Sequence, residues 1–159
     1  MDKLIDDLIK LAFAEDIGDG DHTTLCCIPE TAMGKSQLII KEDGVLAGVE
    51  MAKRIFHDFD PELKMTVFIQ DGAEVKKGDI AFVVEGKIQS LLQTERLMLN
   101  VMQRMSGIAT TTRKYAKALE GTKTHVLDTR KTTPGMRMIE KEACLLYTSD
   151  AADDLIGVD

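Results

Sequence analysis

Aromatic residues are scarce in this 159-residue chain: tryptophan is absent, and phenylalanine and tyrosine together make up 4%. The hydrophobic content of 44% is enough for a core, so aliphatic side chains and the 9 methionines must fill it. Cysteine is also rare, with Cys26 and Cys27 adjacent and Cys144 distant. An odd count without a CxxC spacing argues against a disulfide framework and a zinc site. We therefore interpret all three as reduced thiols of a cytoplasmic protein.

Long apolar runs are missing as well. No stretch approaches the ~20 residues of a membrane-spanning helix, and early acidic residues leave no signal-peptide core. The net charge of −7 and the pI of about 5.0 argue against general binding to nucleic acid or to membrane surfaces. Positive charge is instead concentrated in one segment, where acidic residues dilute five cations: Lys123, Arg130, Lys131, Arg137 and Lys141.

The first 86 residues have the patterns of an α+β unit with a mostly antiparallel sheet. Apolar residues recur at helical spacing over residues 3–15 and 51–59, which predicts two amphipathic helices. The segment around Asp21 and His22 has metal-binding residue types, but we interpret it as a loop in which Asp21 caps the next turn. Short apolar or alternating runs bounded by turns predict strands at residues 38–40, 45–49, 65–69 and 80–84.

From about residue 88 the pattern becomes helical. Leucines and methionines form one face, and polar residues that include Arg96 form the other. Ser106-Gly107 predicts a break, after which a second helix runs over residues 108–119. A short strand at Val126-Leu127 and a short helix over residues 136–141 complete the expected elements.

Two adjacent cations, Arg130 and Lys131, lie shortly after that last strand. Ligands of α/β proteins bind where strands end in loops. Arg130 offers a planar fork for a carboxylate and Lys131 offers a compact point charge, so the pair suits a small anion with more than one acidic group. The alternative is that both are solvated surface cations.

The segment Asp128-Thr129-Arg130-Lys131-Thr132-Thr133-Pro134-Gly135 resembles the DTRKT-x-PG signature of the quinolinate phosphoribosyltransferases, also called carboxylating nicotinate-nucleotide pyrophosphorylases. Three upstream segments match this family in the same order: EDIGDGDHTT at residues 15–24, ERLMLN at 95–100 and SGIAT at 106–110. Any one motif alone would be weak, but together they are specific and cover most of the chain as far as Ala143.

This resemblance implies a glycosyltransferase of NAD biosynthesis. Such an enzyme transfers phosphoribosyl from phosphoribosyl pyrophosphate to quinolinate with decarboxylation, which gives nicotinate mononucleotide. The family's substrate-binding residues carry over to Arg96, Thr129, Arg130 and Lys131, and no catalytic residue is assigned. The resemblance implies that Arg96 reaches quinolinate across the interface of a homodimer or higher homo-oligomer. Mg²⁺ is the implied cofactor, with ligands that are not in this chain.

The fold that the resemblance implies is an α+β N-terminal sandwich domain followed by the truncated start of an α/β barrel domain. Residues 1–107 would form the first domain and residues 108–143 the start of the second. After Ala143 the likeness stops, and residues 144–159 look like translated sequencing-adapter read-through. We interpret them as an artefactual, poorly ordered tail. A complete family member would be nearly twice as long, so we expect this fragment to be inactive alone.

Two alternatives stay open. The first is a related phosphoribosyltransferase-like paralogue that shares the framework. The second is a non-enzymatic carrier or binding module, because residues 71–79 resemble hairpins of biotinyl and lipoyl carriers. A carrier displays a lysine at a hairpin tip, whereas Lys64 lies inside a predicted strand.

Overall fold

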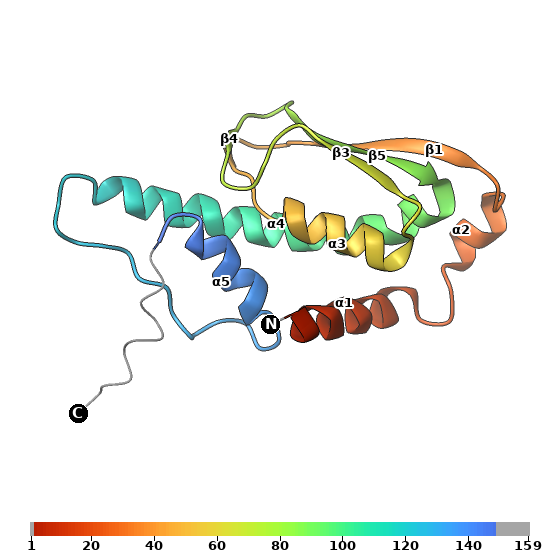
Figure 1. Cartoon of the computed structure of the whole chain (residues 1–159), viewed down its shortest axis with the longest axis horizontal. Helices are drawn as coiled ribbons and strands as arrows, with labels where there is room; N and C mark the ends of the chain where they lie inside the picture. The colour runs from red at the N-terminus through yellow and green to blue at the C-terminus, as the bar shows by residue number, and fades with distance from the viewer. Residues whose placement is uncertain (1, 149–159) are drawn as a thin grey trace.

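The computed structural model describes residues 2–148, and one long helix, α4, runs through its centre. In Figure 1 a strand layer lies along one side of α4, and the shorter helices α1 and α5 lie on the other. No helix among the described residues is both long and apolar enough to cross a membrane. The elements in chain order are α1 (Asp2–Ile17), α2 (His22–Cys27), β1 (Met33–Ile39), β2 (Gly44–Val45), α3 (Val49–Phe59), β3 (Lys64–Val67), β4 (Glu74–Val75), β5 (Ile80–Lys87), α4 (Ile88–Ala118) and α5 (Arg137–Leu145).

Strand β5 is the centre of a three-stranded antiparallel sheet, with β1 on one side and β3 on the other. In this register Val84 lies opposite Ser36 of β1 and Met65 of β3. The four consecutive residues 81–84 are all buried, so both faces of β5 are covered. β2 and β4 pair separately and are also antiparallel. The expected antiparallel α+β unit is confirmed.

Several local predictions for the first half are confirmed. The helices expected at residues 3–15 and 51–59 are α1 and α3, each extended by two residues or fewer at its ends. Asp21 caps α2, because its Oδ1 accepts a 3.1 Å hydrogen bond from the Thr24 amide. Lys64 lies in β3 and not at a hairpin tip, so Lys64 is not placed as the modified lysine of a carrier domain.

The strand predicted at residues 45–49 is wrong beyond Val45, because Val49 already begins α3. Gly48 starts that helix with φ of +98°, and a Cβ there would lie 3.3 Å from the Met102 Cα on α4. Asp71 accepts a 2.8 Å hydrogen bond from the Val49 amide and so caps the helix. The close approach to α4 and this distant cap decide the helix start, and neither is visible in the local pattern.

The break predicted at Ser106-Gly107 is wrong, because α4 continues through it as a single 31-residue helix. One glycine lowers helix propensity by about 1 kcal/mol, which tertiary contacts can offset. Here the Ser106 Oγ accepts a 3.0 Å hydrogen bond from the Ala47 amide, and the Thr110 Oγ1 accepts one of 2.9 Å from the Val45 amide. Ser106, which is part of the predicted break, and Thr110 therefore attach the β2 segment to the helix.

The strand predicted at Val126-Leu127 is also wrong, because only an isolated bridge forms at Leu127. A parallel strand needs neighbours on both sides and cover on both faces. Leu127 is 46% exposed, so this segment lacks such cover in the described part of the chain. The helix predicted at residues 136–141 is confirmed as α5 and extends to Leu145, with Ile139 and Ala143 buried.

The expected unpacked tail is wrong for its first residues. Cys144 and Leu145 complete α5, and the Tyr147 hydroxyl donates a hydrogen bond to the Gly72 carbonyl. The Arg113 guanidinium carbon lies 5.3 Å from the centre of the Tyr147 ring, within cation–π range. Residues 144–148 therefore pack on the domain, and residues 149–159 lie outside the described residues.

Candidate functional site

Residues 128–133, which we call the cationic loop, connect the Leu127 bridge to the segment before α5. The backbone turns locally at its start, because the Thr129 amide donates a 2.6 Å hydrogen bond to the Asp128 Oδ1. The Lys131 amide then donates one of 3.2 Å to the Thr129 Oγ1. Thr129, Arg130 and Lys131 are exposed, so the three predicted site residues of this loop lie together at the surface.

Asp128 anchors the beginning of the cationic loop to α5. Its side chain is only 5% exposed, and its Oδ2 lies 3.4 Å from the Nζ of Lys141, whose side chain is 15% exposed. This contact is an ion pair and not a hydrogen bond, since Oδ2 receives no hydrogen bond from the described residues. It supports the interpretation that Asp128 stabilises the loop and does not take part in the chemistry.

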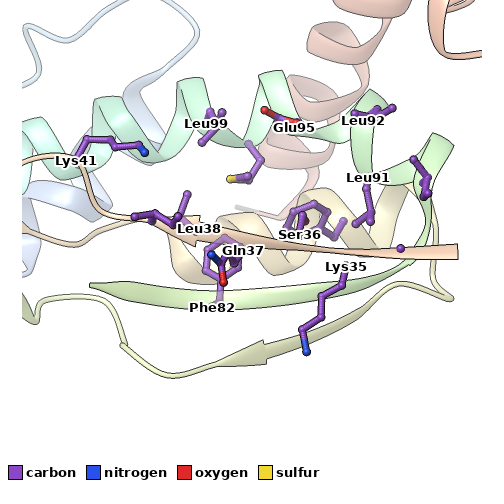
Figure 2. Close-up of a pocket in the computed structure, with 15 residues that line it drawn as sticks. Lys35, Ser36, Gln37, Leu38, Lys41, Phe82, Leu91, Leu92, Glu95 and Leu99 are labelled. Atoms are coloured by element: carbon purple, nitrogen blue, oxygen red, sulfur yellow. The ribbon is translucent and has the colours of Figure 1, made fainter. Parts of the chain in front are cut away.

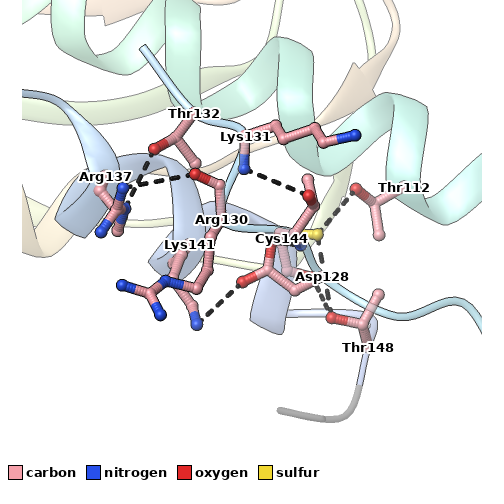
Figure 3. Close-up of polar contacts among 10 residues, drawn as sticks. Thr112, Asp128, Arg130, Lys131, Thr132, Arg137, Lys141, Cys144 and Thr148 are labelled. Carbon is pink, nitrogen blue, oxygen red and sulfur yellow. Dashed lines mark hydrogen bonds and ion pairs between the residues drawn. The ribbon is translucent and has the colours of Figure 1, made fainter. Parts of the chain in front are cut away.

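Arg137 forms hydrogen bonds with the middle of the cationic loop. Figure 3 shows its guanidinium beside the loop, where it donates 3.3 Å hydrogen bonds to the Arg130 carbonyl and to the Thr132 Oγ1. Both bonds are long and solvent-exposed, so each contributes little alone. Their position matters more, because one holds the backbone just before Lys131 and the other holds the side chain just after it.

Glu140 anchors the end of the loop and is itself nearly buried, with 8% of its surface exposed. Its Oε1 accepts a 2.7 Å hydrogen bond from the Arg104 Nε on α4, and its Oε2 accepts one of 3.1 Å from the Thr133 amide. The Arg104 Nη2 also donates to the Thr133 hydroxyl. Burial works against the charged carboxylate, but these hydrogen bonds outweigh it and hold the pKa of Glu140 below its usual value.

Arg96, the fourth predicted site residue, lies elsewhere. It projects from α4 with 70% of its side chain exposed and pairs with Asp16 at the end of α1. The hydrogen bond and the charge of Asp16 raise the pKa of the Arg96 guanidinium. No contact links Arg96 to Arg130 or Lys131 among the described residues. The structure therefore brings together three of the four predicted residues and leaves Arg96 apart within one chain.

The arrangement can bind a small anion with two acidic groups. The loop backbone is anchored at three points, and the two acidic residues involved, Asp128 in the loop and Glu140 on α5, are each paired with a cation. Arg130 and Lys131 have no carboxylate partner in the described part of the chain, so their charges are not neutralised by the protein. Two such cations on a fixed backbone can hold two carboxylates at a set separation.

A groove with a volume of about 410 Å³ lies between β1 and α4, apart from the cationic loop (Figure 2). Leu38, Leu92 and Leu99 line it, and Lys35, Lys41 and Glu95 supply its charged groups. None of the four predicted site residues lines this groove. Its walls are mainly apolar, and Lys35 is already paired with Glu85 at 2.7 Å, so the cationic loop remains the better candidate for a dianion.

The described residues do not include a metal centre. No group of three or more His, Cys, Asp and Glu side chains in residues 2–148 could hold a metal ion. The side chains present therefore do not fit the Mg²⁺ that the family resemblance implies.

Sequence reasoning missed Arg104 as a contributor to the site. It lies 36 positions before its partner Glu140, on a different element. The spacing of Arg137, Glu140 and Lys141 at i, i+3 and i+4 was a usable signal, because it places three charged side chains on one face of a helix. No local pattern identifies Arg104 as their partner.

Comparison with known proteins finds matches to a single enzyme family. The family model for the N-terminal domain of quinolinate phosphoribosyl transferase matches residues 21–106, and the model for the C-terminal domain matches residues 108–150. Quinolinate phosphoribosyltransferase (decarboxylating) 1 of Nicotiana glauca is 45% identical over 140 residues, which are 87% of this chain and 39% of that protein. A probable carboxylating nicotinate-nucleotide pyrophosphorylase of Synechocystis is 39% identical over 98% of this chain and 52% of its own length.

Solved structures of the same family also resemble this chain. The crystal structure of NadC from Streptococcus pyogenes superposes with a TM-score of 0.89 at 37% identity, over 94% of this chain and 53% of that one. The nicotinate-nucleotide pyrophosphorylase of Francisella tularensis gives 0.86 at 31% identity, over 94% and 54%. The expected fold is confirmed as an α+β N-terminal domain followed by the start of a C-terminal domain. The chain spans about 40–50% of the length of these relatives.

Proposed function

Because the chain belongs to the quinolinate phosphoribosyl transferase family, we propose that it contributes the quinolinate-binding cations of such an enzyme. The reaction transfers phosphoribosyl from phosphoribosyl pyrophosphate to quinolinate. Pyrophosphate and CO₂ leave, and nicotinate mononucleotide is formed for NAD biosynthesis. The single observation that supports this most is the cationic loop, which presents Arg130 and Lys131 on an anchored backbone without acidic partners among residues 2–148.

Quinolinate carries two carboxylates on adjacent ring carbons, and two adjacent cations match that pattern. The Arg130 fork takes one carboxylate through two parallel hydrogen bonds, and the Lys131 ammonium neutralises the other. Thr129 adds a hydroxyl or backbone contact beside them. Holding both carboxylates orients the pyridine nitrogen toward the ribosyl carbon, which lowers the entropic cost of the transfer. When CO₂ leaves, the electron pair of the broken carbon–carbon bond remains on the ring carbon, so the site must stabilise the charge that develops there and at the ribosyl centre.

The alternative of a related paralogue would use the same loop for a different acid. The adjacent cations favour a dicarboxylate over a monocarboxylate such as nicotinate, because one of the two charges would otherwise have no partner. Binding of quinolinate against nicotinate therefore separates the two functions.

Mg²⁺ is proposed as the metal of the whole enzyme, where it would neutralise the departing pyrophosphate. No group of side chains suited to bind it occurs in residues 2–148. We expect the purified 159-residue chain to form no nicotinate mononucleotide from quinolinate and phosphoribosyl pyrophosphate. Detectable product would contradict this expectation.

Arg96 is proposed to reach the same ligand from a second copy of the chain, in a homodimer or higher homo-oligomer. Its side chain is largely exposed and lies on the polar face of α4, and its only carboxylate partner among the described residues is Asp16. An exposed pair of this kind contributes about 0–1 kcal/mol, so Arg96 can leave Asp16 at little cost. A cytoplasmic location is also proposed, although some plant relatives are mitochondrial or chloroplastic.

Calorimetric titration of the 159-residue chain with quinolinate tests the proposed site. We expect saturable binding at one site per loop and weaker binding of nicotinate. Arg130→Ala and Lys131→Ala should each weaken binding about tenfold or more, since a charge-assisted hydrogen bond contributes about 1.5–3 kcal/mol. Lys123→Ala is the matched control, because Lys123 is an exposed cation outside the loop. Equal losses in Lys123→Ala and Lys131→Ala would contradict a specific site.

A further inference from the structure

One face of α5 contacts the cationic loop at three successive points. Arg137 contacts the Arg130 carbonyl, Glu140 accepts from the Thr133 amide, and Lys141 pairs with Asp128. Residues spaced by three and four positions lie on the same side of a helix. Three side chains on one side of α5 therefore hold the loop.

The Lys141–Asp128 pair is the most buried of these attachments, with 15% and 5% of the two side chains exposed. Asp128 uses both carboxylate oxygens: Oδ2 lies 3.4 Å from the Lys141 Nζ, and Oδ1 accepts a 2.6 Å hydrogen bond from the Thr129 amide. One carboxylate therefore connects α5 to the residue that immediately precedes Arg130 (Figure 3).

We propose that Lys141 is a positioning residue for dicarboxylate recognition. It orients Asp128, which in turn fixes the Thr129 amide and thereby the backbone from which the Arg130 side chain projects. This inference rests on the proposed function, because it assigns to Arg130 the binding of a ligand carboxylate. Lys141 itself does not contact the ligand, since its ammonium is directed to Asp128 and most of its side chain is covered.

The effect of Lys141 is one of preorganisation. A ligand that bridges Arg130 and Lys131 gains most when the separation of the two cations is fixed before binding. Without the Lys141 ammonium, the buried Asp128 carboxylate loses its cationic partner and turns toward water. The Thr129 amide then loses its acceptor, and Arg130 and Lys131 sample many separations.

The first readout needs no ligand. Amide hydrogen exchange of the 159-residue chain is compared between wild type, Lys141→Met and Lys141→Arg, with Lys114→Met as control for loss of an exposed helix lysine. We expect faster exchange at Thr129 in Lys141→Met, restored toward the wild-type rate in Lys141→Arg, and no change in Lys114→Met. Unchanged exchange at Thr129 in a folded Lys141→Met variant overturns the proposal.

The second readout is a double-mutant cycle of Lys141→Met and Arg130→Ala. The affinity of each variant for quinolinate is measured by titration. Lys141→Met should weaken binding about tenfold when Arg130 is present and have little further effect in Arg130→Ala, because residues that act through one another are not additive. Fully additive losses overturn the positioning role. Asp128→Asn, which keeps the shape but loses the charge, should behave as Lys141→Met does, and wild-type affinity in that variant also counts against the proposal.

Failure of the proposed function can be distinguished from failure of the positioning role of Lys141. If the wild-type chain binds no quinolinate while Thr129 exchange still depends on Lys141, the proposed function fails and the link from Lys141 to the loop is retained. If the chain binds quinolinate through Arg130 but neither exchange nor affinity depends on Lys141, only the positioning role fails. Circular dichroism of each variant establishes that a loss of binding is measured on folded protein.

Discussion

The Arg104 Nε on α4 donates a 2.7 Å hydrogen bond to the Oε1 of the nearly buried Glu140 on α5. Together with the packing of α5 on α4, this contact holds the helix that comes after the cationic loop. The same carboxylate accepts the Thr133 amide at 3.1 Å, so the loop end and both helices meet at a single side chain. Folding of the first domain thus determines where the site cations lie.

We expect Arg104→Met to destabilise the chain by about 1–3 kcal/mol, because a nearly buried carboxylate would lose its charged donor. Urea unfolding measures this difference in the free energy of unfolding. Arg96→Ala is the control, since the Arg96–Asp16 pair is exposed and should contribute no more than about 1 kcal/mol. Equal losses in the two variants would show that Glu140 does not need Arg104.

The lowered pKa of Glu140 predicts the direction of a pH effect. A carboxyl whose pKa is lower in the folded state stabilises that state above its unfolded pKa, which is about 4.3 for glutamate. This contribution is lost as the pH falls from there through the lower pKa of the folded state. Glu140→Gln should therefore flatten the pH dependence of the melting temperature below about pH 4.5. If the melting temperature of Glu140→Gln falls at acid pH as steeply as that of the wild type, Glu140 does not cause this part of the pH dependence.

Thr110→Val should destabilise the chain by about 1–2 kcal/mol, because the Val45 amide would lose the hydroxyl that accepts its hydrogen bond. Thr111→Val is a matched control one position along α4. The Thr111 hydroxyl is exposed and bonds only to the Gly107 carbonyl of its own helix. Thermal unfolding should therefore separate the two variants, and a loss in Thr111→Val as large as in Thr110→Val would refute the attachment of β2 to α4.

Residues 144–148 should contribute to stability. A chain that ends at Ala143 loses the last turn of α5, the Tyr147 contact with Arg113 and the Tyr147 hydrogen bond to Gly72. We expect it to melt several degrees below a chain that ends at Thr148, since about 1 kcal/mol shifts the midpoint by roughly 2–4 °C at this size. Identical melting curves would mean that these contacts do not stabilise the protein.

Much of the fold can be read from local pattern, and the exceptions have a common cause. α1, α3, β3 and β5 were predictable because each has a continuous apolar periodicity of its own. The continuation of α4 through Gly107 was not predictable, because its stability there comes from hydroxyl contacts to residues about 60 positions earlier. The strand at Val126-Leu127 failed for the opposite reason, since suitable residues form no strand without neighbours.

The site likewise contains residues that the sequence predicts and residues that it does not. Thr129, Arg130 and Lys131 were found from their motif and do lie together at the surface. Arg104 was not, because its partner Glu140 is 36 positions away. The motif identified the residues that are proposed to bind the ligand, whereas the residues that hold the loop became visible only in the folded chain.

The placement of Arg96 predicts sharing of the site between subunits in the full-length enzyme that carries this half. An Arg96→Ala subunit and an Arg130→Ala subunit should each be nearly inactive, because a carboxylate left without its cation typically costs about 2–5 kcal/mol. When mixed, they should form dimers with one intact site made of Arg96 from one chain and Arg130 from the other. Heterodimers that form without regaining activity would place Arg96 in its own subunit's site or outside any site.

The central claim is that the cationic loop binds the two carboxylates of quinolinate. A crystal structure of the 159-residue chain with bound quinolinate tests this most directly. The account predicts one ligand carboxylate within about 3 Å of the Arg130 guanidinium and the other near the Lys131 ammonium, with the Asp128–Lys141 pair intact. Quinolinate bound in the groove between β1 and α4, with Arg130 and Lys131 in solvent, would contradict it.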